Sequence, residues 1–193
     1  MARTKAFDTQ EVLEKAMYVF WEHGYEHTSM QQLVDTMGIH RRSIYDTFGD
    51  KHQLFLTVLH YYETMLSQTI EQKLTSSMTT YEKLDAVFSI ATATTDSLNF
   101  GCLLVNTATE LSAIDPVIAK EVQGFFTKEE EYLNMILVQA KENQELPITV
   151  DTQHLSAYLH NAFVGIRVLA KTEHDQTKLK QIIYQTLQYL PLT

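Results

Sequence analysis

The chain has 193 residues, of which 45% are hydrophobic and 20% charged, so it has enough apolar side chains to fold around a core and is unlike a disordered protein. Its apolar runs are far shorter than the roughly 20 residues of a membrane-spanning helix, and its N-terminus does not resemble a signal peptide. Its one cysteine cannot form an intramolecular disulfide. We therefore expect a cytoplasmic protein without a membrane partner.

The net charge of −9 is unevenly distributed. Residues 1–52 hold six Lys or Arg and eight Asp or Glu, so most of the excess acidity falls in the C-terminal part. The basic side chains of the first part gather at Arg3 with Lys5, and at Arg41 and Arg42 followed by Lys51. Basic clusters of this kind bind phosphates of nucleic acid. Because the cluster is small, we expect two chains to be needed for useful affinity.

Helix start and stop signals occur along the whole chain, and no segment alternates as a strand would. Thr28 with Gln31 forms a capping box, Asp115 before Pro116 is a strong N-terminal signal, and Gly38 is a C-terminal stop. The pattern predicts an all-α fold of about nine helices. The expected helices span residues 8–23, 28–37, 40–48, 51–76, 79–93, 102–111, 115–143, 151–171 and 175–190.

Three of these helices lie in the first 48 residues, and a glycine-ended turn at Gly38 separates the second from the third. This spacing is typical of a helix-turn-helix, whose second helix enters the major groove of DNA. Ile44 and Phe48 lie one turn apart and are expected to face the core. Arginine reads guanine edges, and hydroxyls and lysine contact phosphates. The candidate DNA contacts on and after this helix are Arg41, Arg42, Tyr45, Thr47 and Lys51.

The most specific pattern here is Tyr45, Phe48 and Lys51 at intervals of three after the glycine-ended turn. The same stretch also carries Ala16, Phe20, Gly24-Tyr25, Thr28-Ser29-Met30, Ile44, Gly49-Asp50 and Leu54. With these residues, the segment 7–54 resembles the DNA-binding domain of the TetR/AcrR family of bacterial transcriptional regulators.

The resemblance implies phosphate contacts by Tyr45 and Lys51, and positions near base edges for Arg41, Arg42 and Thr47. It also implies backbone contacts at the start of the second helix, where the candidates are Thr28, Ser29 and Gln31. His40 departs from the small N-cap residue common at its position, and its role stays open.

We expect a DNA-binding domain over residues 1–52, and a ligand-binding and dimerisation domain over residues 53–193. A homodimer would read a pseudo-palindromic operator in double-stranded DNA with two recognition helices about 34 Å apart. The resemblance implies a repressor that a small-molecule effector releases, while activation stays open. The segment from Phe100 to Asn106 resembles one branch of the family but does not identify an effector.

The expected eighth helix is apolar on two sides, so both sides must be covered. Its side of smaller residues would allow a second helix to approach closely, as in a symmetric dimer. Full burial within one chain is the alternative. The expected interface residues are Ala157, Asn161, Val164, Gly165 and Val168, with Ile183 and Leu187 from the last helix.

Aromatic, methionine and a few polar side chains in the C-terminal part suggest a cavity for a small lipophilic effector. Ordinary core packing explains the same pattern, so both interpretations stay open. The candidate ligand-binding residues are Met65, Phe88, Cys102, Asn106, Phe126, Tyr132, His160 and Phe163.

Other function classes have weaker support. A repressor that senses oxidants or electrophiles through Cys102 is an alternative, because a helix N-terminus lowers a thiol pKa. His23 and His27 flank Gly24 and do not share a helix face, so we expect no metal site. The run Glu129-Glu130-Glu131 is interpreted as a solvated face. We find no catalytic motif and expect neither an enzyme nor a cofactor; an architectural DNA-binding protein without a ligand is a further rival.

Overall fold

The computed structural model describes residues 7–92 and 100–192, and within them the fold is all-α, as predicted. Arg3 and Lys5 therefore lie outside the described residues. The fifth helix ends at Ile90, three residues before its expected end, and residue 93 is also outside the described part. The helices are α1 (Thr9–His23), α2 (Met30–Met37), α3 (Arg41–Phe48), α4 (Lys51–Lys73), α5 (Thr80–Ile90), α6 (Leu103–Leu111), α7 (Pro116–Glu142), α8 (Thr152–Leu169) and α9 (Gln176–Gln188).

Aspartates begin five of these helices and so fix their boundaries locally. Each carboxylate accepts hydrogen bonds from first-turn backbone amides, which have no partner inside the helix. These N-caps are Asp8, Asp50, Asp115, Asp151 and Asp175. Pro116 occupies the first position of α7, where its missing N–H removes no helical hydrogen bond.

The start of α2 differs from the prediction. Its capping box joins Ser29 and Gln32: the Ser29 hydroxyl accepts from the Gln32 amide at 3.2 Å, and the Gln32 side chain accepts from the Ser29 amide at 2.8 Å. The predicted box of Thr28 and Gln31 is therefore wrong by one residue. The physical reason is that the Thr28 hydroxyl donates to the Gly24 carbonyl at 2.6 Å, which uses it in the preceding turn.

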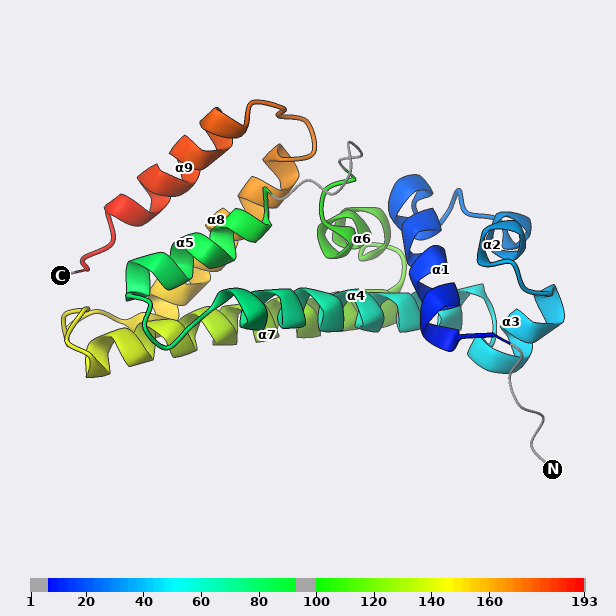
Figure 1. The fold of residues 1–193 in the computed structure, drawn as a ribbon, viewed down its shortest axis with the longest axis horizontal. Coiled ribbons are helices and arrows are strands. Elements are labelled where there is room, and N and C mark those ends of the chain that lie inside the picture. Colours follow the sequence, from blue (N-terminus) through cyan, green and yellow to red (C-terminus); the bar gives the residue numbers. More distant parts are fainter. Residues whose placement is uncertain (1–6, 93–99, 193) are drawn as a thin grey trace.

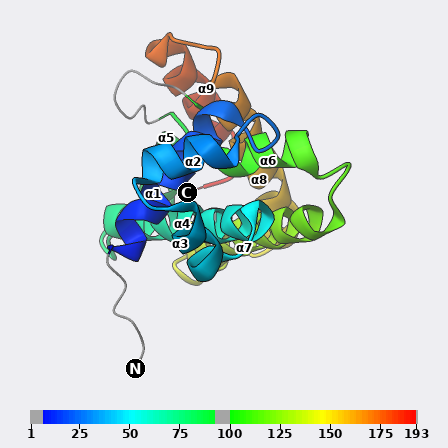
Figure 2. The same cartoon turned by 90° about the vertical axis from the view of Figure 1, so that its right-hand side faces the viewer.

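The helices are arranged along two long ones, α4 and α7 (Figure 1). Helices α1–α3 lie at one end of α4, and α5, α8 and α9 lie at the other (Figure 1). In the end view α4 and α7 lie next to each other with α6 above them (Figure 2). Three side-chain pairs join α4 to α7 and its N-cap residue. They are His52 with Asp115 at 2.8 Å, His60 with Glu121 at 3.3 Å, and Glu63 with Lys128 at 3.3 Å.

Buried apolar side chains form two clusters. The first joins α1–α4 with α6 and the beginning of α7, and the second joins α5, the end of α7, α8 and α9. In the first cluster Phe20 of α1 packs against Phe55 of α4 with ring centroids 4.9 Å apart. The first core therefore continues across the expected domain boundary at residue 52, and that boundary stays a prediction.

Polar contacts also join the helix-turn-helix to the rest of the chain. The Glu110 carboxylate on α6 accepts from the backbone amides of Tyr25 at 3.1 Å and Glu26 at 2.9 Å. The Trp21 indole donates to the Gly101 carbonyl at 3.1 Å. A movement of α6 would thus act directly on the turn that precedes α2.

Candidate nucleic-acid interface and internal cavity

Helix α3 has a buried face and an exposed face, as its pattern predicts. Ile44 and Phe48 are buried in the first core cluster. Arg41 and Arg42 are exposed, and Tyr45 is 47% exposed. These three side chains are therefore available to a partner from solvent. Thr47 is only half-buried and contributes less surface.

The charges on this face have weak partners within the chain. Arg42 lies 3.6 Å from Asp46, but both side chains are largely exposed, so solvent screens the pair. His40, the N-cap of α3, makes no side-chain hydrogen bond to the helix amides. An arriving phosphate could therefore compete successfully for these groups.

Lys51 extends the basic face from the first turn of α4. Its ammonium lies 4.2 Å from the centre of the Tyr25 ring, which limits the directions the side chain can take. Partial burial lowers the pKa of Lys51, and the nearby Glu26 and Glu110 carboxylates act in the opposite direction. The result is a positioned cation at a helix N-terminus, where backbone amides also favour an anion.

The candidate contacts to the DNA backbone at α2 differ in their exposure to solvent. Ser29 and Gln31 are exposed at its N-terminal end, and the Gln31 amide also donates to Asp35 at 2.8 Å. Thr28, by contrast, is only 1% exposed. A contact of its side chain with DNA is therefore a wrong expectation, because the chain's own fold covers it and its hydroxyl is bonded to Gly24.

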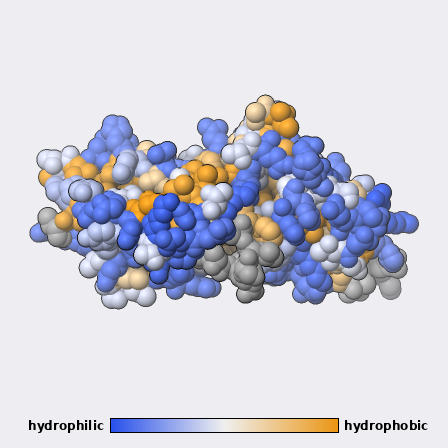
Figure 3. All heavy atoms as spheres, turned by 90° about the horizontal axis from the view of Figure 1, so that it is seen from above, coloured by the Kyte–Doolittle hydropathy of each residue, from blue (hydrophilic) through white to orange (hydrophobic). Residues whose placement is uncertain are grey.

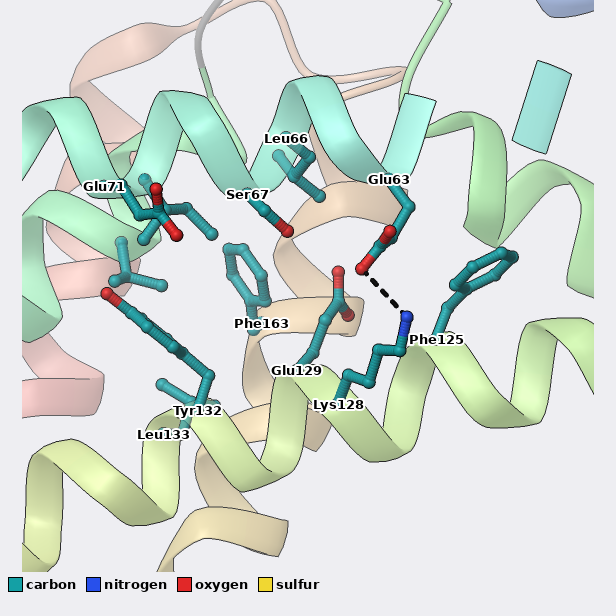
Figure 4. Close-up of a pocket in the computed structure, with 12 residues that line it drawn as sticks. Glu63, Leu66, Ser67, Glu71, Phe125, Lys128, Glu129, Tyr132, Leu133 and Phe163 are labelled. Carbon is teal, nitrogen blue, oxygen red and sulfur yellow. Dashed lines mark hydrogen bonds and ion pairs between the residues drawn. The ribbon is translucent and has the colours of Figure 1, made fainter. Parts of the chain in front are cut away.

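A cavity of about 230 Å³ lies between α4, α5, α7 and α8. Figure 4 shows acidic side chains from α4 and α7 and the Phe163 ring from α8 directed at the same space. The cavity thus combines aromatic faces with carboxylates. It is lined by Glu63, Leu66, Ser67, Ile70, Glu71, Val87, Phe125, Lys128, Glu129, Tyr132, Leu133 and Phe163.

Two of the eight candidate ligand-binding residues, Tyr132 and Phe163, line this cavity. Phe88 does not: it is fully buried and packs against Phe163 with ring centroids 5.4 Å apart, so it is a core residue. Met65 and Cys102 instead line a separate cavity of about 130 Å³, which lies between α1, α4, the end of α5, the residues before α6, and Arg167 of α8.

The remaining candidates also lie away from the main cavity. Phe126 and His160 line an open groove formed by α6, α7 and α8. The Asn106 amide donates to the Phe100 carbonyl at 2.8 Å, and its oxygen accepts from Lys171 at 3.3 Å, so it holds the start of α6. Placing all eight residues in one ligand site is therefore wrong, because helix periodicity does not reveal which helix each face meets.

A buried ion-pair network was missed by the sequence interpretation. Glu129 was assigned to a solvated face, but its carboxylate accepts two hydrogen bonds from Arg167, at 2.8 and 3.0 Å, and lies 3.1 Å from His160. Arg167 is 4% exposed, and its guanidinium lies 3.8 Å from the centre of the Phe163 ring. The available signal was an arginine between Ile166 and Val168 in the apolar stretch of the expected eighth helix.

The same network sets the charge on Glu129. Burial by itself raises the pKa of this carboxyl, but the hydrogen bonds and positive charges of His160 and Arg167 outweigh it and lower the pKa below the usual range. Glu129 is therefore an ionised carboxylate in the cavity wall at neutral pH.

Four of the five predicted dimer residues on α8 are exposed. Ala157, Asn161, Gly165 and Val168 face solvent, and Val164 is half-buried. Apolar side chains also gather among polar ones on the face seen in Figure 3. Further large exposed side chains on α8 and α9 are Tyr158, Leu169 and Tyr184.

The two predicted dimer residues on α9 are not accessible to a second chain. Ile183 and Leu187 are buried in the second core cluster, because this face of α9 packs against α5 and α8 of the same chain. Their assignment to a dimer interface is therefore wrong. Tyr184, on the other face of α9, is the exposed side chain that the prediction omitted.

Two negative findings apply to the residues that the structure describes. In that part of the chain, no three His, Cys, Asp or Glu side chains approach one another closely enough to hold a metal ion. Across residues 7–92 and 100–192, none of the helices combines the length and hydropathy that crossing a membrane requires.

Comparisons with known proteins agree with this architecture. Residues 12–58 match the model of the tetR family of bacterial regulatory proteins, and residues 80–186 match the model of the tetracyclin repressor-like C-terminal domain. The HTH-type transcriptional repressor ComR of Escherichia coli strain K12 is 32% identical over 192 residues, which cover 98% of this chain and 91% of ComR. The HTH-type transcriptional regulator YezE of Bacillus subtilis strain 168 is 32% identical and is covered over its whole length by 98% of this chain.

Solved structures show the same fold. A cysteine mutant of the TetR family transcriptional regulator CifR, complexed with 26-base-pair double-strand operator DNA, aligns with a TM-score of 0.88 at 23% identity over 98% of this chain and 100% of that one. A TetR transcriptional regulator from Chloroflexus aurantiacus J-10-FL aligns with a TM-score of 0.82 at 22% identity over 92% of this chain and 91% of that one.

These matches do not favour the thiol-sensing alternative, and Cys102 is buried at 5% exposure. The helix-turn-helix geometry, both family models and full-length relatives above 30% identity agree with one another. The chain belongs to the TetR family of transcriptional regulators.

Proposed function

We propose that the protein is a repressor that binds a pseudo-palindromic operator in double-stranded DNA as a homodimer, and that a small-molecule effector releases it. The observation that carries the proposal is the exposed face of α3, on which Arg41, Arg42 and Tyr45 have only weak partners within the chain. Support comes from ComR, whose name describes a repressor, and from CifR, whose structure contains operator DNA. Action on DNA implies a cytoplasmic location.

The DNA-binding part of this proposal is tested with the double variant Tyr45→Ala/Lys51→Ala. An operator fragment is first selected from random duplexes, and its binding is then followed by fluorescence anisotropy at several salt concentrations. We expect the variant to bind about 100-fold more weakly, and the slope of log K against log salt to fall by about two, one lysine for each subunit.

The matched control removes a lysine and a tyrosine from the opposite end of the molecule. Lys73 ends α4 and Tyr189 is 80% exposed after α9. Lys73→Ala/Tyr189→Ala should leave both the affinity and the salt slope unchanged. If Tyr45→Ala/Lys51→Ala binds the operator as tightly as this control does, α3 is not the recognition helix.

The dimer is proposed to form through the exposed small-residue face of α8. An added Cβ at Gly165 meets no atom within 4 Å inside the chain, and the same is true of Gly124 on α7. Gly165→Leu should therefore raise the dimer dissociation constant by blocking the approach of a second α8, whereas Gly124→Leu should not. Sedimentation equilibrium measures both, and a dimer in which Gly165→Leu has no effect would place the interface elsewhere.

The effector is proposed to occupy the cavity between α4, α5, α7 and α8. Helix α4 connects this cavity with the DNA-binding face, because Glu63 in the cavity wall and Lys51 at the DNA-binding face are both on it. Twelve residues of helix separate the two by about 18 Å. A ligand that binds unequally to the DNA-bound and released states would shift the position of α4. This would change the spacing between the recognition helices of the two subunits.

We propose that residues 1–52 form a DNA-binding unit and that residues 53–193 form an effector-binding and dimerisation unit. Because α6 caps the turn at Tyr25 through Glu110, the two units are coupled by α6 as well as by α4. Glu110→Ala removes both accepting oxygens of this cap and is expected to weaken operator release more than operator binding.

A further inference from the structure

The charges in the wall of the main cavity are unbalanced. Three carboxylates line it, from Glu63 and Glu71 on α4 and Glu129 on α7, against the one ammonium of Lys128. Glu129 is compensated by Arg167 behind the wall, at 2.8 Å. The carboxylates of α4 therefore determine which charge the empty part of the cavity favours.

Glu63 is placed to receive a positive charge from outside. Its side chain is 21% exposed, whereas that of its partner Lys128 is 60% exposed, and the ammonium lies 3.3 Å from the carboxylate. Figure 4 shows both side chains directed toward the cavity, with Lys128 on α7 and Glu63 on α4. Lys128 thus reaches from solvent toward a deeper carboxylate, and it can return to water when another cation takes its place.

Aromatic faces surround the same space. Phe125 and Tyr132 approach from α7 and Phe163 from α8. Two of these rings already contact cationic side chains of the chain itself: the Arg167 guanidinium behind the wall lies 3.8 Å from the Phe163 centroid, and the Lys128 ammonium lies 5.6 Å from the Phe125 centroid. Carboxylates combined with aromatic faces are the groups that recognise ammonium ions.

We propose that the effector is a small organic cation, a protonated amine or quaternary ammonium joined to an apolar ring, which replaces Lys128 at Glu63 and places its ring between Tyr132 and Phe163. This inference rests on the proposed function, because it names the ligand class of the same cavity. A neutral ligand would leave Glu63 paired with Lys128 and would gain no charge interaction with it. An anion would meet carboxylates in a partly desolvated site, where like charges repel most strongly.

The cavity volume limits the size of this cation. An apolar cavity of about 150 Å³ holds benzene. The volume of about 230 Å³ here fits one ring with a short cationic side chain. Benzyltrimethylammonium has this size, neopentylbenzene is its neutral isostere, and 3-phenylpropionate is an anion of similar size.

The test uses isothermal titration calorimetry of the full-length protein with these three probes. We expect benzyltrimethylammonium to bind about tenfold more tightly than neopentylbenzene, because its pair with Glu63 would lie inside the cavity, whereas the Lys128 pair that it replaces is screened by solvent. Glu63→Gln should remove this preference and leave neopentylbenzene binding unchanged, whereas Lys128→Met should strengthen cation binding because the internal competitor is lost. Glu131→Gln, an exposed residue of α7 outside the cavity, is the matched charge control.

Different results of these titrations lead to different conclusions. Equal binding of the cation and its neutral isostere, stronger binding of 3-phenylpropionate, or unchanged cation binding in both Glu63→Gln and Lys128→Met would overturn the inference. Because the two variants are expected to change affinity in opposite directions, a general loss of structure cannot imitate the result. Operator binding, measured separately by anisotropy, tests the proposed function: intact operator binding without any cation preference would refute the ligand class alone.

Discussion

Arginines in the two halves of the molecule have opposite environments. Arg41 and Arg42 on α3 are exposed, and Arg42 has only a screened pair with Asp46. Arg167 on α8 is 4% exposed and holds Glu129 with two hydrogen bonds. The first pair is free to act on a partner from solvent, and the third stabilises the fold.

The difference shows what a charge contributes in each place. An exposed ion pair contributes little to folding because water screens it, so the α3 arginines can be optimised for DNA. A buried guanidinium must be paired, since an isolated buried charge is strongly unfavourable. The comparison therefore predicts that substitutions in α3 change binding, whereas substitutions at Arg167 change stability first.

The largest expected effect is at Arg167. Arg167→Met leaves Glu129 buried with His160 as its remaining partner, and we expect a loss of about 3–5 kcal/mol in the free energy of unfolding. Urea denaturation at a fixed protein concentration measures it. Lys178→Met, which removes the exposed pair with Glu173, is the control and should change stability by less than about 1 kcal/mol. Equal losses in the two variants would contradict the comparison.

Arg41 should give the next largest effect, on DNA binding. Arg41→Ala is expected to weaken operator binding by about 1–3 kcal/mol and to relax the preference at one base pair in each half-site. The midpoint of urea unfolding should stay close to that of the parent. Affinities for single-base operator variants measure the relaxation, and Lys180→Ala on α9 serves as the control. A uniform loss across all operator variants would identify Arg41 as a phosphate contact.

Acid should destabilise the C-terminal network in a defined direction. The pKa of Glu129 is lower in the folded protein than its ordinary value of 4.5, despite the opposing effect of burial, because His160 and Arg167 favour the ionised form. Its stabilising contribution is therefore complete above the unfolded-state pKa and is lost as pH falls through the lower folded-state pKa.

We expect the stability difference between the parent and Glu129→Gln to shrink as pH is lowered from 7 into this range, when measured by urea denaturation. Other carboxyls with lowered pKa values, such as Asp115, remain in both proteins and cancel in the comparison. A difference that stays constant down to pH 3 would show that the Glu129 charge does not stabilise the fold.

The smallest effect compares a glycine of each half. Gly38 ends α2 with φ of 68°, and no atom within 4 Å would meet its Cβ, so the strain of Gly38→Ala comes from the backbone alone. We expect a loss of about 1 kcal/mol. Gly124→Ala lies within α7 in equally open space, and helix propensity predicts a gain of up to about 1 kcal/mol. Changes of the same sign in thermal unfolding would contradict this account.

Much of the helical layout could be predicted because its determinants are local. The aspartate N-caps, Pro116 and Gly38 act within one turn of their own position, and the order of the helices followed from them. The exposed and buried faces of α3 also followed, because Ile44 and Phe48 lie one turn apart on a short helix. The one-residue shift at α2 arose because Thr28 with Gln31 and Ser29 with Gln32 both fit the capping-box pattern.

The cavity and the network could not be predicted in the same way. Tyr132 of α7 and Phe163 of α8 line the same cavity, and Phe88 is buried against Phe163, but all three are aromatic residues at helical spacing. Glu129 differs from Glu130 and Glu131 only in facing Arg167, which is 38 residues further along the chain. Residue type is the same in each set, and only the neighbouring helix distinguishes the members.

The sequence by itself determined the all-α fold, the helix-turn-helix and the basic face of α3, because caps, turns and one short amphipathic helix depend on contacts within a few residues. The tertiary structure alone decided that Ile183 and Leu187 are core residues, that Thr28 is covered, and that Glu129 is paired with Arg167. Those outcomes depend on which helix faces meet, and that is fixed by packing between segments distant in the sequence.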